Sequence, residues 1–571
     1  MKIKFLGFVV ITFMACSSPS AFAQVRLVQN GKSSSRIVLA PDSRLNRTAA
    51  NILQRFIKEA STCKLPVLVN VTPRQNDIVL GGTTGATVKD DGFSFSTKGK
   101  VVRIAGKENG VVYGAVALLE KYFKMDYWGD HEYSLPITKN IQLPVVSFVE
   151  NPAFTYRQLQ SYALGDSIYK WWYRLEEPNE MFASTYWVHT SDRLLPVSQY
   201  GKSHPEYFAF YDGKRHTEDI TQLCLTNKEV LNIVVHHIYS IFKKNPTMNT
   251  IAFSQNDNFS YCRCDKCAAV DKEEGSTSGT LIRFVNAIAA KFPDKKIVTL
   301  AYQYTRKPPL MVKPAPNVGI MLCDIECTRE VPLTESKNGQ DFIVALKDWG
   351  KITKNIFLWD YGINFAHYMF PFPNFQVLQD NIQLFKNNNV TMHFSEIESD
   401  RGGDFAELRA YIVAKLMWND QLNVDSLMHH FLDGYYGKAA PYIKDYIELM
   451  KGALLGSGKE LGIFESPMNH LDGMFRPALM KRYNELFNKA ELAVADNTMY
   501  LKRVQRSRLP LQYMTLEIAR KEGFKDYNSI NETLKLFEQR TKEFCVTTLR
   551  EVHYTPAQYC SSYREELEKH R

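Results

Sequence analysis

The chain has 571 residues and a formal net charge of +9; 45% of its residues are hydrophobic and 23% are charged. This composition excludes a disordered chain, and a length of about 100–200 residues per domain predicts about three domains. The positive charge is spread along the chain without a basic block, so no nucleic-acid partner is expected.

The first 23 residues have the order of a secretory signal peptide: Lys2 and Lys4 at the start, an apolar run over 5–15, and small residues before position 24. We therefore expect an exported protein, located in the periplasm or at the cell surface. Cys16 leaves a second route open, the attachment of lipid to this cysteine. No later stretch holds the ~20 apolar residues of a membrane helix, so no transmembrane segment is predicted.

Residues 24–148 are predicted to form a small α/β domain. Short β-rich runs occupy 78–82, 93–95 and 101–104 and are bounded by glycine and polar turns. Apolar residues then recur at helical spacing over 112–123, which predicts a helix on one face of the sheet. Pro136, Pro144 and Pro152 mark the exit from this domain and indicate a linker.

Residues 153–425 alternate between apolar runs and helical stretches, which predicts a parallel sheet buried on both faces. With about 270 residues, the region is predicted to be a (β/α)8 TIM-type barrel and the catalytic domain. Thr226 and Glu229 are expected to form the capping box of one helix. The expected strands are 222–226, 250–255, 297–302, 318–323, 355–359 and 390–394.

Residues 426–571 contain no convincing strand pattern and are predicted to form a helical C-terminal domain. Apolar residues at helical spacing indicate amphipathic helices over 427–455, 477–492 and 530–552.

Ten cysteines are present, and three of them form one cluster, Cys262, Cys264 and Cys267. Disulfides or plain structural thiols are the first interpretation of this cluster. Zinc is the second, although a closed tetrahedral site needs a fourth ligand, for which Cys323 or Cys327 is the candidate. No cofactor is predicted.

Acidic residues follow several of the apolar runs, and active sites of such barrels lie at the carboxyl ends of the strands. Hydrolysis of a glycosidic bond needs one carboxylic acid that stays protonated and one carboxylate, and neighbouring acids have unequal pKa values. For any single acid, helix capping or pairing with a basic side chain is the alternative. The candidate acids are Asp257, Asp324, Glu326, Asp360, Glu396 and Glu398.

Aromatic, amide and imidazole groups near the same strand ends suit the faces and hydroxyl groups of a sugar, with packing inside the barrel as the alternative for each ring. The sequence has no glycine-rich phosphate loop, nucleophile elbow or two-histidine zinc helix, which argues against kinases, dinucleotide enzymes, serine hydrolases and metalloproteases. The candidates for substrate binding are Asn256, His189, Tyr302, Trp359, Tyr361, Asn364, Glu396 and Glu398.

Two stretches carry a family resemblance. Asp91-Gly92-Phe93, with the later runs 102–106 and 110–114, resembles the small domain that precedes the barrel in glycoside hydrolase families 20, 67 and 84. The remainder resembles the bacterial family named domain of unknown function 4838, which implies a glycosidase-like fold without fixing a substrate. The residues that carry this second resemblance include His204-Pro-Glu-Tyr207, Gln255-Asn-Asp257 with the three clustered cysteines, Leu408-Arg-Ala-Tyr411 and Tyr435-Tyr-Gly437.

The resemblance also implies roles for some acids. Asn256-Asp257 matches the position of the acidic pair in families 20 and 84, although the first member here is Asn. Asp324 or Glu326, together with Asp360, falls near the strand ends that carry the base carboxylates of the family 67 α-glucuronidases.

Our hypothesis from the sequence is an exported glycoside hydrolase that removes a terminal sugar of the uronic acid or N-acetylhexosamine class from a carbohydrate substrate. Asp257 is the leading proton donor, and Glu326 or Asp360 is the candidate base, with Asp324 as a further candidate. The alternative is a carbohydrate-binding protein without turnover on a glycosidase-like barrel. The sequence does not predict an oligomeric state.

Overall fold

The computed structural model describes residues 24–397 and 400–571. The described chain divides into two compact units: unit 1 comprises 24–125 and 135–151, and unit 2 comprises 126–134 and the remainder from 152 onward. The expected signal peptide over 1–23 and the candidate Glu398 lie outside the described residues. Within the described residues, no helix is both long and apolar enough to cross a membrane.

Unit 1 contains a mixed six-stranded sheet, a two-stranded antiparallel sheet of β1 (Val25–Val28) and β9 (Ile141–Leu143), and two helices, α1 (Arg44–Ser61) and α2 (Gly110–Phe123). A Cβ atom on Gly114 would lie 2.4 Å from Ile104 Cγ2, so only glycine lets α2 pack this closely on the sheet. Helix α2 confirms the helix that was predicted over 112–123. The strand order is β10 (Ser147–Glu150), β5 (Phe93–Ser96), β6 (Val102–Gly106), β4 (Ile78–Leu80), β2 (Ile37–Leu39) and β3 (Val67–Val69).

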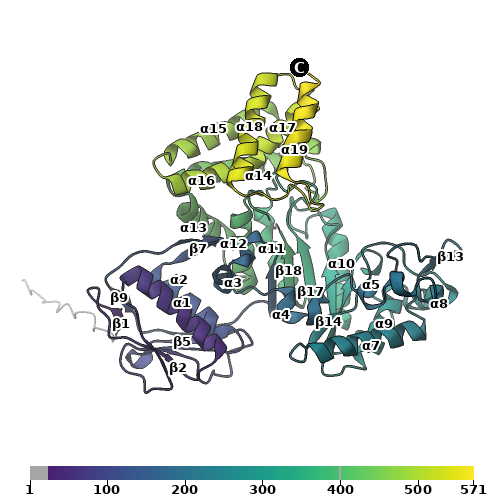
Figure 1. The fold of residues 1–571 in the computed structure, drawn as a ribbon, viewed down its shortest axis with the longest axis horizontal. Helices are drawn as coiled ribbons and strands as arrows, with labels where there is room; N and C mark the ends of the chain where they lie inside the picture. Colours follow the sequence, from purple (N-terminus) through teal and green to yellow (C-terminus); the bar gives the residue numbers. More distant parts are fainter. Residues whose placement is uncertain (1–23, 398–399) are drawn as a thin grey trace, which may run out of the picture. The chain divides into compact units, whose positions relative to one another are not determined.

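The centre of unit 2 is a curled, wholly parallel sheet of six strands (Figure 1). Val318–Cys323 is buried at every position, as a strand covered on both faces requires. Parallel strands bring their carboxyl ends to one edge of the sheet, where side chains from distant parts of the sequence meet. The order is β11 (Tyr156–Leu159), β18 (Val390–Glu396), β17 (Ile356–Tyr361), β16 (Val318–Cys323), β15 (Lys296–Ala301) and β14 (Thr250–Ala252).

The expected (β/α)8 barrel is confirmed only in part, because this sheet is a half-barrel. A (β/α)8 barrel would have two further strands between β11 and β14, and the described residues form neither of them. Phe182 makes only a single parallel bridge to Thr250 in this region. The run 222–226, expected to be a strand, contributes only one antiparallel bridge, from Leu223 to Phe208. Short helical turns and loops occupy most of this region instead.

Helices α7 (Lys228–Lys244), α9 (Ser278–Ala289), α10 (Lys337–Ile352), α11 (Leu378–Asn387) and α12 (Ala406–Trp418) accompany the sheet. The predicted capping of α7 by Thr226 is wrong by one residue. Asn227 is the N-cap and accepts a hydrogen bond from the backbone N–H of Glu229 at 2.9 Å, whereas the Thr226 hydroxyl lies 3.2 Å from Cys267 Sγ.

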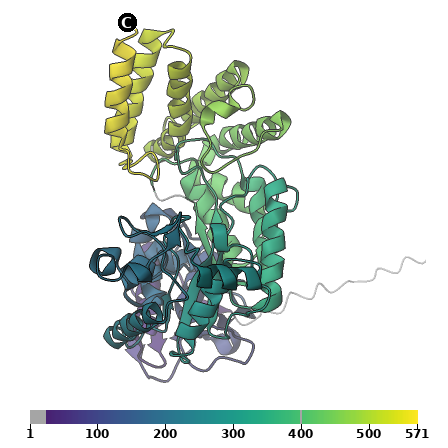
Figure 2. The ribbon, with the colours of Figure 1, turned by 90° about the vertical axis from the view of Figure 1, so that its right-hand side faces the viewer.

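The C-terminal region is helical, as predicted, and its helices pack against one another (Figures 1 and 2). The stretch 427–455 is two helices, because Gly437 takes a positive φ of 54° between them. The helices are α13 (Val424–Tyr436), α14 (Ala440–Ser457), α15 (Pro477–Ala493), α16 (Thr498–Ser507), α17 (Leu509–Lys521), α18 (Tyr527–Glu543) and α19 (Pro556–Glu568).

The helix expected over 530–552 ends early, at Glu543. A carboxylate oxygen of Asp400 accepts hydrogen bonds from the backbone N–H groups of Thr547 and Thr548, at 2.7 and 2.6 Å. These N–H groups are therefore used in a tertiary contact and not in a helix. The helix ends where Cys545 takes a left-handed φ of 54°, so residues 546–555 form a loop, and this loop carries Glu551.

Candidate active site

A cavity of about 690 Å3 lies at the carboxyl ends of the parallel strands in unit 2. Strands β11, β17 and β18 contribute lining residues directly, and the segments after β14, β15 and β16 contribute others. Six of the predicted site residues line it: His189, Asp257, Tyr302, Trp359, Tyr361 and Glu396.

The register between β17 and β18 determines which side chains face the cavity. Trp359 is paired with Phe394 and Tyr361 with Glu396, and all four side chains line the cavity. Asp360 lies between the two β17 rings, so its side chain points to the opposite face of the sheet. The sequence-based strand ended at Trp359, whereas β17 continues to Tyr361 and therefore carries Asp360 away from the cavity.

An aromatic wall, formed by Trp187, Trp359, Tyr361 and Phe394, borders the cavity. The Trp187 and Trp359 rings are stacked at 5.6 Å between centroids, and so are the Trp359 and Tyr361 rings. Phe394 meets Trp187 edge-on at 5.0 Å. Trp359 and Trp187 are each partly exposed, so the wall offers flat apolar surface of the kind that stacks on a sugar ring.

Glu396 is the acid most strongly altered by its surroundings in the cavity. Burial raises the pKa of its carboxyl to about 7, and the neighbouring charge of Glu551 also raises it. The indole N–H of Trp359 donates to Glu396 Oε2 at 2.8 Å, which opposes part of this increase because the bond favours the charged form. Glu396 is therefore suited to hold a proton near neutral pH.

Asp257 follows β14 and reaches the cavity with an exposed side chain. The hydroxyl of Tyr302 donates to its Oδ1 at 3.1 Å. Burial raises the pKa of Tyr302, and the charge of Asp257 raises it further, so the phenol stays a donor. Burial also raises the pKa of Glu551, with Asp257 as the second cause. Three acids of the cavity are thus linked electrostatically, and Glu551 interacts with both of the others.

Asp324 and Asp360 do not line the cavity; they belong to a buried ionic cluster around Arg329. Arg329 Nη2 lies 2.8 Å from Asp324 Oδ1 and 3.8 Å from Asp360 Oδ1, while His393 Nε2 lies 3.8 Å from Asp360 Oδ2. Burial is the largest cause that raises the pKa of Asp324 well above its usual range. Burial works in the same direction on Asp360, but His393 and Arg329 outweigh it and lower that pKa.

Three other predicted site residues have contacts elsewhere. Glu326 is exposed and pairs with Arg306 at 3.1 Å. Asn256 is buried and donates through Nδ2 to the Thr221 carbonyl at 2.6 Å. Asn364 is buried and donates to the carbonyl of Glu465 at 2.9 Å. Of the four acids predicted to be catalytic, Asp257 therefore lines the cavity, whereas Asp324, Glu326 and Asp360 do not.

Sequence reasoning missed several residues that line the cavity. Gln158 and Gln160 come from the end of β11, a strand that was not expected. Glu177 lies in the irregular segment after it, and Glu551 lies in the loop that was expected to be helical. The run Tyr156-Arg-Gln-Leu159 has neither a clear polar–apolar alternation nor a continuous apolar stretch, so local pattern did not indicate β11.

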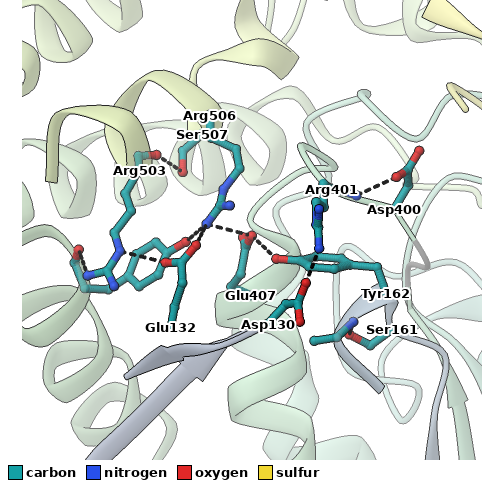
Figure 3. A network of polar contacts seen from close by, with 12 residues as sticks. Asp130, Glu132, Ser161, Tyr162, Asp400, Arg401, Glu407, Arg503, Arg506 and Ser507 are labelled. Carbon is teal, nitrogen blue, oxygen red and sulfur yellow. Dashed lines mark hydrogen bonds and ion pairs between the residues drawn. The ribbon is translucent and has the colours of Figure 1, made fainter. Parts of the chain in front are cut away.

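A polar network fixes the wall of the cavity next to Ser161 and Leu164 (Figure 3). The Tyr162 hydroxyl donates to Glu407 of α12 at 2.5 Å, and Arg506 of α16 pairs with the same carboxylate at 3.2 Å. Arg506 also pairs with Glu132 at 3.0 Å. The segment after β11 is thereby tied to α12 and α16, which limits movement of this wall.

The geometry supports acid–base chemistry on a sugar-sized molecule. The cavity combines a flat aromatic wall, a buried carboxyl group with a raised pKa, and further carboxylates within electrostatic reach. Two acids with unequal pKa values are the minimum that glycoside hydrolysis requires.

Comparison with known structures gives glycoside hydrolases as neighbours. The structure is similar to the family 89 glycoside hydrolase from Clostridium perfringens in complex with 2-acetamido-1,2-dideoxynojirmycin, with a TM-score of 0.53 and 12% identity over 87% of this chain and 65% of that chain. The GH20 β-N-acetylhexosaminidase from Streptomyces coelicolor A3(2) has a TM-score of 0.43 and 12% identity, with 74% of this chain and 93% of that chain covered. A GH138 enzyme that targets pectin rhamnogalacturonan II has a TM-score of 0.42 and 12% identity, with 94% of this chain and 98% of that chain covered.

A comparison with curated proteins gives no match. The family model described as domain of unknown function (DUF4838) matches residues 127–448, which is more than half of the chain and includes the parallel sheet. The resemblance seen in the sequence is confirmed: the chain belongs to the DUF4838 family, and its fold is like that of glycoside hydrolases.

Proposed function

We propose that this protein is a glycoside hydrolase in which Glu396 donates the proton to the leaving oxygen. One observation carries this proposal: the carboxyl group of Glu396 has a pKa raised to about 7 beside an aromatic wall in a cavity of about 690 Å3. A general acid with a pKa near the working pH is protonated when the substrate binds and still transfers its proton readily.

Asp257 is the second carboxylate of this proposal. The Tyr302 hydroxyl donates a hydrogen bond to its Oδ1 at 3.1 Å and so orients this carboxylate in the cavity. Asp257 would attack the anomeric carbon or activate a water molecule there. The proposal thus exchanges the role first expected for Asp257, because the buried Glu396 is better suited to hold the proton.

Glu551 has a separate part in the proposal. Its negative charge raises the pKa of Glu396 and its own pKa is raised, chiefly by burial and also by Asp257. It would therefore keep the proton on Glu396 until the substrate arrives.

The charge of the cavity favours a neutral or acetamido sugar over a uronic acid. Glu177, Asp257, Glu396 and Glu551 line it, and no Lys or Arg is among the described lining residues. A sugar carboxylate would meet like charges without a cationic partner, which costs binding energy. Of the two classes expected from the sequence, the N-acetylhexosamine class is the one we propose.

The test is a panel of aryl glycosides that compares neutral hexosides, N-acetylhexosaminides and uronides. We expect release of the aryl group from an N-acetylhexosaminide, and a loss of about 100-fold or more in kcat for Glu396→Gln with a smaller change in KM. Hydrolysis of uronides alone would contradict the substrate class. Full turnover by Glu396→Gln would contradict its role as proton donor.

Binding without turnover is the alternative that the same panel addresses. Measurable binding of sugars with no released product from any of them would favour a carbohydrate-binding protein on this fold. We also propose export of the protein through the segment over 1–23; cleavage before residue 24, found by N-terminal sequencing of the mature protein, would support it.

A further inference from the structure

We propose that Cys224, Cys262, Cys264 and Cys267 form a structural zinc site. The four Sγ atoms all lie within 4.8 Å of one another, and three of the four residues are buried. This proposal does not depend on the proposed hydrolase activity, because none of the four cysteines lines the cavity.

The fourth ligand, which the sequence pattern lacked, is Cys224. It lies 38 positions before Cys262, in the turn that precedes α7. The two residues suggested earlier, Cys323 and Cys327, are not part of this group. The cysteine cluster thus joins three segments: the turn before α7, the loop before α8 (Asp265–Glu274), and the first turn of α8.

Two of the sulfur–sulfur separations match tetrahedral coordination. Cys224 Sγ lies 3.8 Å from Cys264 Sγ and 4.0 Å from Cys267 Sγ. Zn–S bonds of about 2.3 Å in a tetrahedron place the sulfur atoms about 3.8 Å apart. A disulfide needs about 2.05 Å between two sulfur atoms and would break this near-equal spacing.

Donor groups surround the sulfur atoms. The backbone N–H of Phe210 donates to Cys262 Sγ at 3.3 Å, and the Thr226 hydroxyl lies 3.2 Å from Cys267 Sγ. Arg215 Nη1 lies 3.5 Å from Cys262 Sγ. Four thiolates and one Zn2+ carry a net charge of −2 after the four thiol protons leave, and a guanidinium with N–H donors stabilises this charge.

A bound zinc ion would also hold the segment that carries Asp257. Gln222 Nε2 donates to the carbonyl groups of Asn256 and Asn258, at 2.8 and 3.0 Å. Asp257 therefore lies between two hydrogen-bonded neighbours, and Cys224 and Cys262 would tie the same two segments together through the metal. Zinc here would replace the rigidity that regular barrel strands supply in this part of the fold.

The first experiment measures metal in the full chain purified without chelator. We expect about one zinc ion per chain by elemental analysis, and release of this zinc when the thiols are blocked with a mercurial reagent. Cobalt added to the metal-free protein should give the visible absorption of a tetrahedral thiolate complex. Failure of the metal-free protein to take up Zn2+ or Co2+, or peptide mapping that finds these cysteines in disulfides, would overturn the proposal.

Variants assign the site to these residues. Cys224→Ser should lose the bound zinc and unfold at a lower temperature, whereas Cys545→Ser, an exposed cysteine outside the cluster, should keep both properties. If Cys224→Ser does not fold, Thr226→Val serves instead; it removes a donor to Cys267 and should weaken zinc binding about tenfold in competition with a chelator. Unchanged zinc affinity in a folded Cys224→Ser, or in Thr226→Val where Cys224→Ser does not fold, would contradict the assignment.

Discussion

Trp359 donates its indole N–H to Glu396 at 2.8 Å, across two neighbouring strands of the parallel sheet. Trp359 could stack on a sugar ring, and its indole N–H also affects the pKa of Glu396, the proposed proton donor. The hydrogen bond stabilises the carboxylate and so keeps the pKa of Glu396 lower than burial alone would make it.

Replacement of Trp359 by Phe should raise the pKa of Glu396 further, since the ring remains and the donor is lost. A hydrogen bond to a charged group contributes about 1.5–3 kcal/mol, so we expect an upward shift of about one unit or more. In a pH profile of kcat/KM, the fall in rate on the alkaline side should move to higher pH. Trp187→Phe is the matched control, because Trp187 lines the same wall and its indole nitrogen bonds no carboxylate. Equal shifts in both variants would contradict the role of this hydrogen bond.

The stability of Glu396→Gln should depend on pH in a defined way. The folded-state pKa of Glu396 is raised from 4.5 to about 7, so its contribution is fully present below pH 4.5 and is lost as the pH rises through 7. The difference corresponds to about 3 kcal/mol as an upper value. Glutamine carries no charge, so the variant should gain stability relative to the wild type between pH 4 and pH 8. Denaturant unfolding at both pH values measures this; a constant difference would show that Glu396 ionises normally.

We expect Asp324→Asn to lower the stability of the folded protein and to have little effect on kcat. Asp324 is buried and pairs with Arg329, whose guanidinium also donates to the carbonyl of Tyr361 at 2.6 Å. A hydrogen bond to a charged group such as the Arg329 guanidinium contributes about 1.5–3 kcal/mol, and the amide oxygen of Asn can keep part of this contact. We expect a lower unfolding midpoint with kcat within about tenfold of the wild type. Glu326→Gln, at an exposed pair, should change neither quantity. A loss of turnover in a fully stable Asp324→Asn would restore its predicted catalytic role.

The sequence predicted most strands of the parallel sheet, because long buried strands are continuous apolar runs. It placed Glu396 and the Trp359 and Tyr361 rings near one another for the same reason. It could not separate Asp360 from these rings, since the alternation of side chains applies only if β17 is known to continue to Tyr361. The full barrel was an inference from length and alternation, and neither property shows that Leu223 makes only one isolated bridge.

The contribution of the C-terminal region to the site was not predictable from local pattern. The apolar spacing over 530–552 continues as if the helix did, and Glu551 would then lie on its surface. The helix ends because Cys545 takes a left-handed φ of 54° and the N–H of Val546 bonds back to the carbonyl of Thr541. Asp400, about 150 positions earlier, then accepts the backbone N–H groups of Thr547 and Thr548 and holds the loop that follows. Likewise Cys224 is distant from the other cysteines in the sequence, so spacing alone gave three ligands and not four.

Glu551→Gln tests whether this C-terminal loop takes part in the chemistry. The charge of Glu551 raises the pKa of Glu396, so its removal should lower that pKa by up to about one unit. The fall in kcat/KM on the alkaline side should then begin at a lower pH, in the opposite direction to the shift expected for Trp359→Phe. Glu177→Gln is the control: Glu177 also lines the cavity, but it is not a cause of the raised pKa of Glu396. A pH profile that is unchanged in Glu551→Gln would mean that the loop encloses the cavity without influencing its acid.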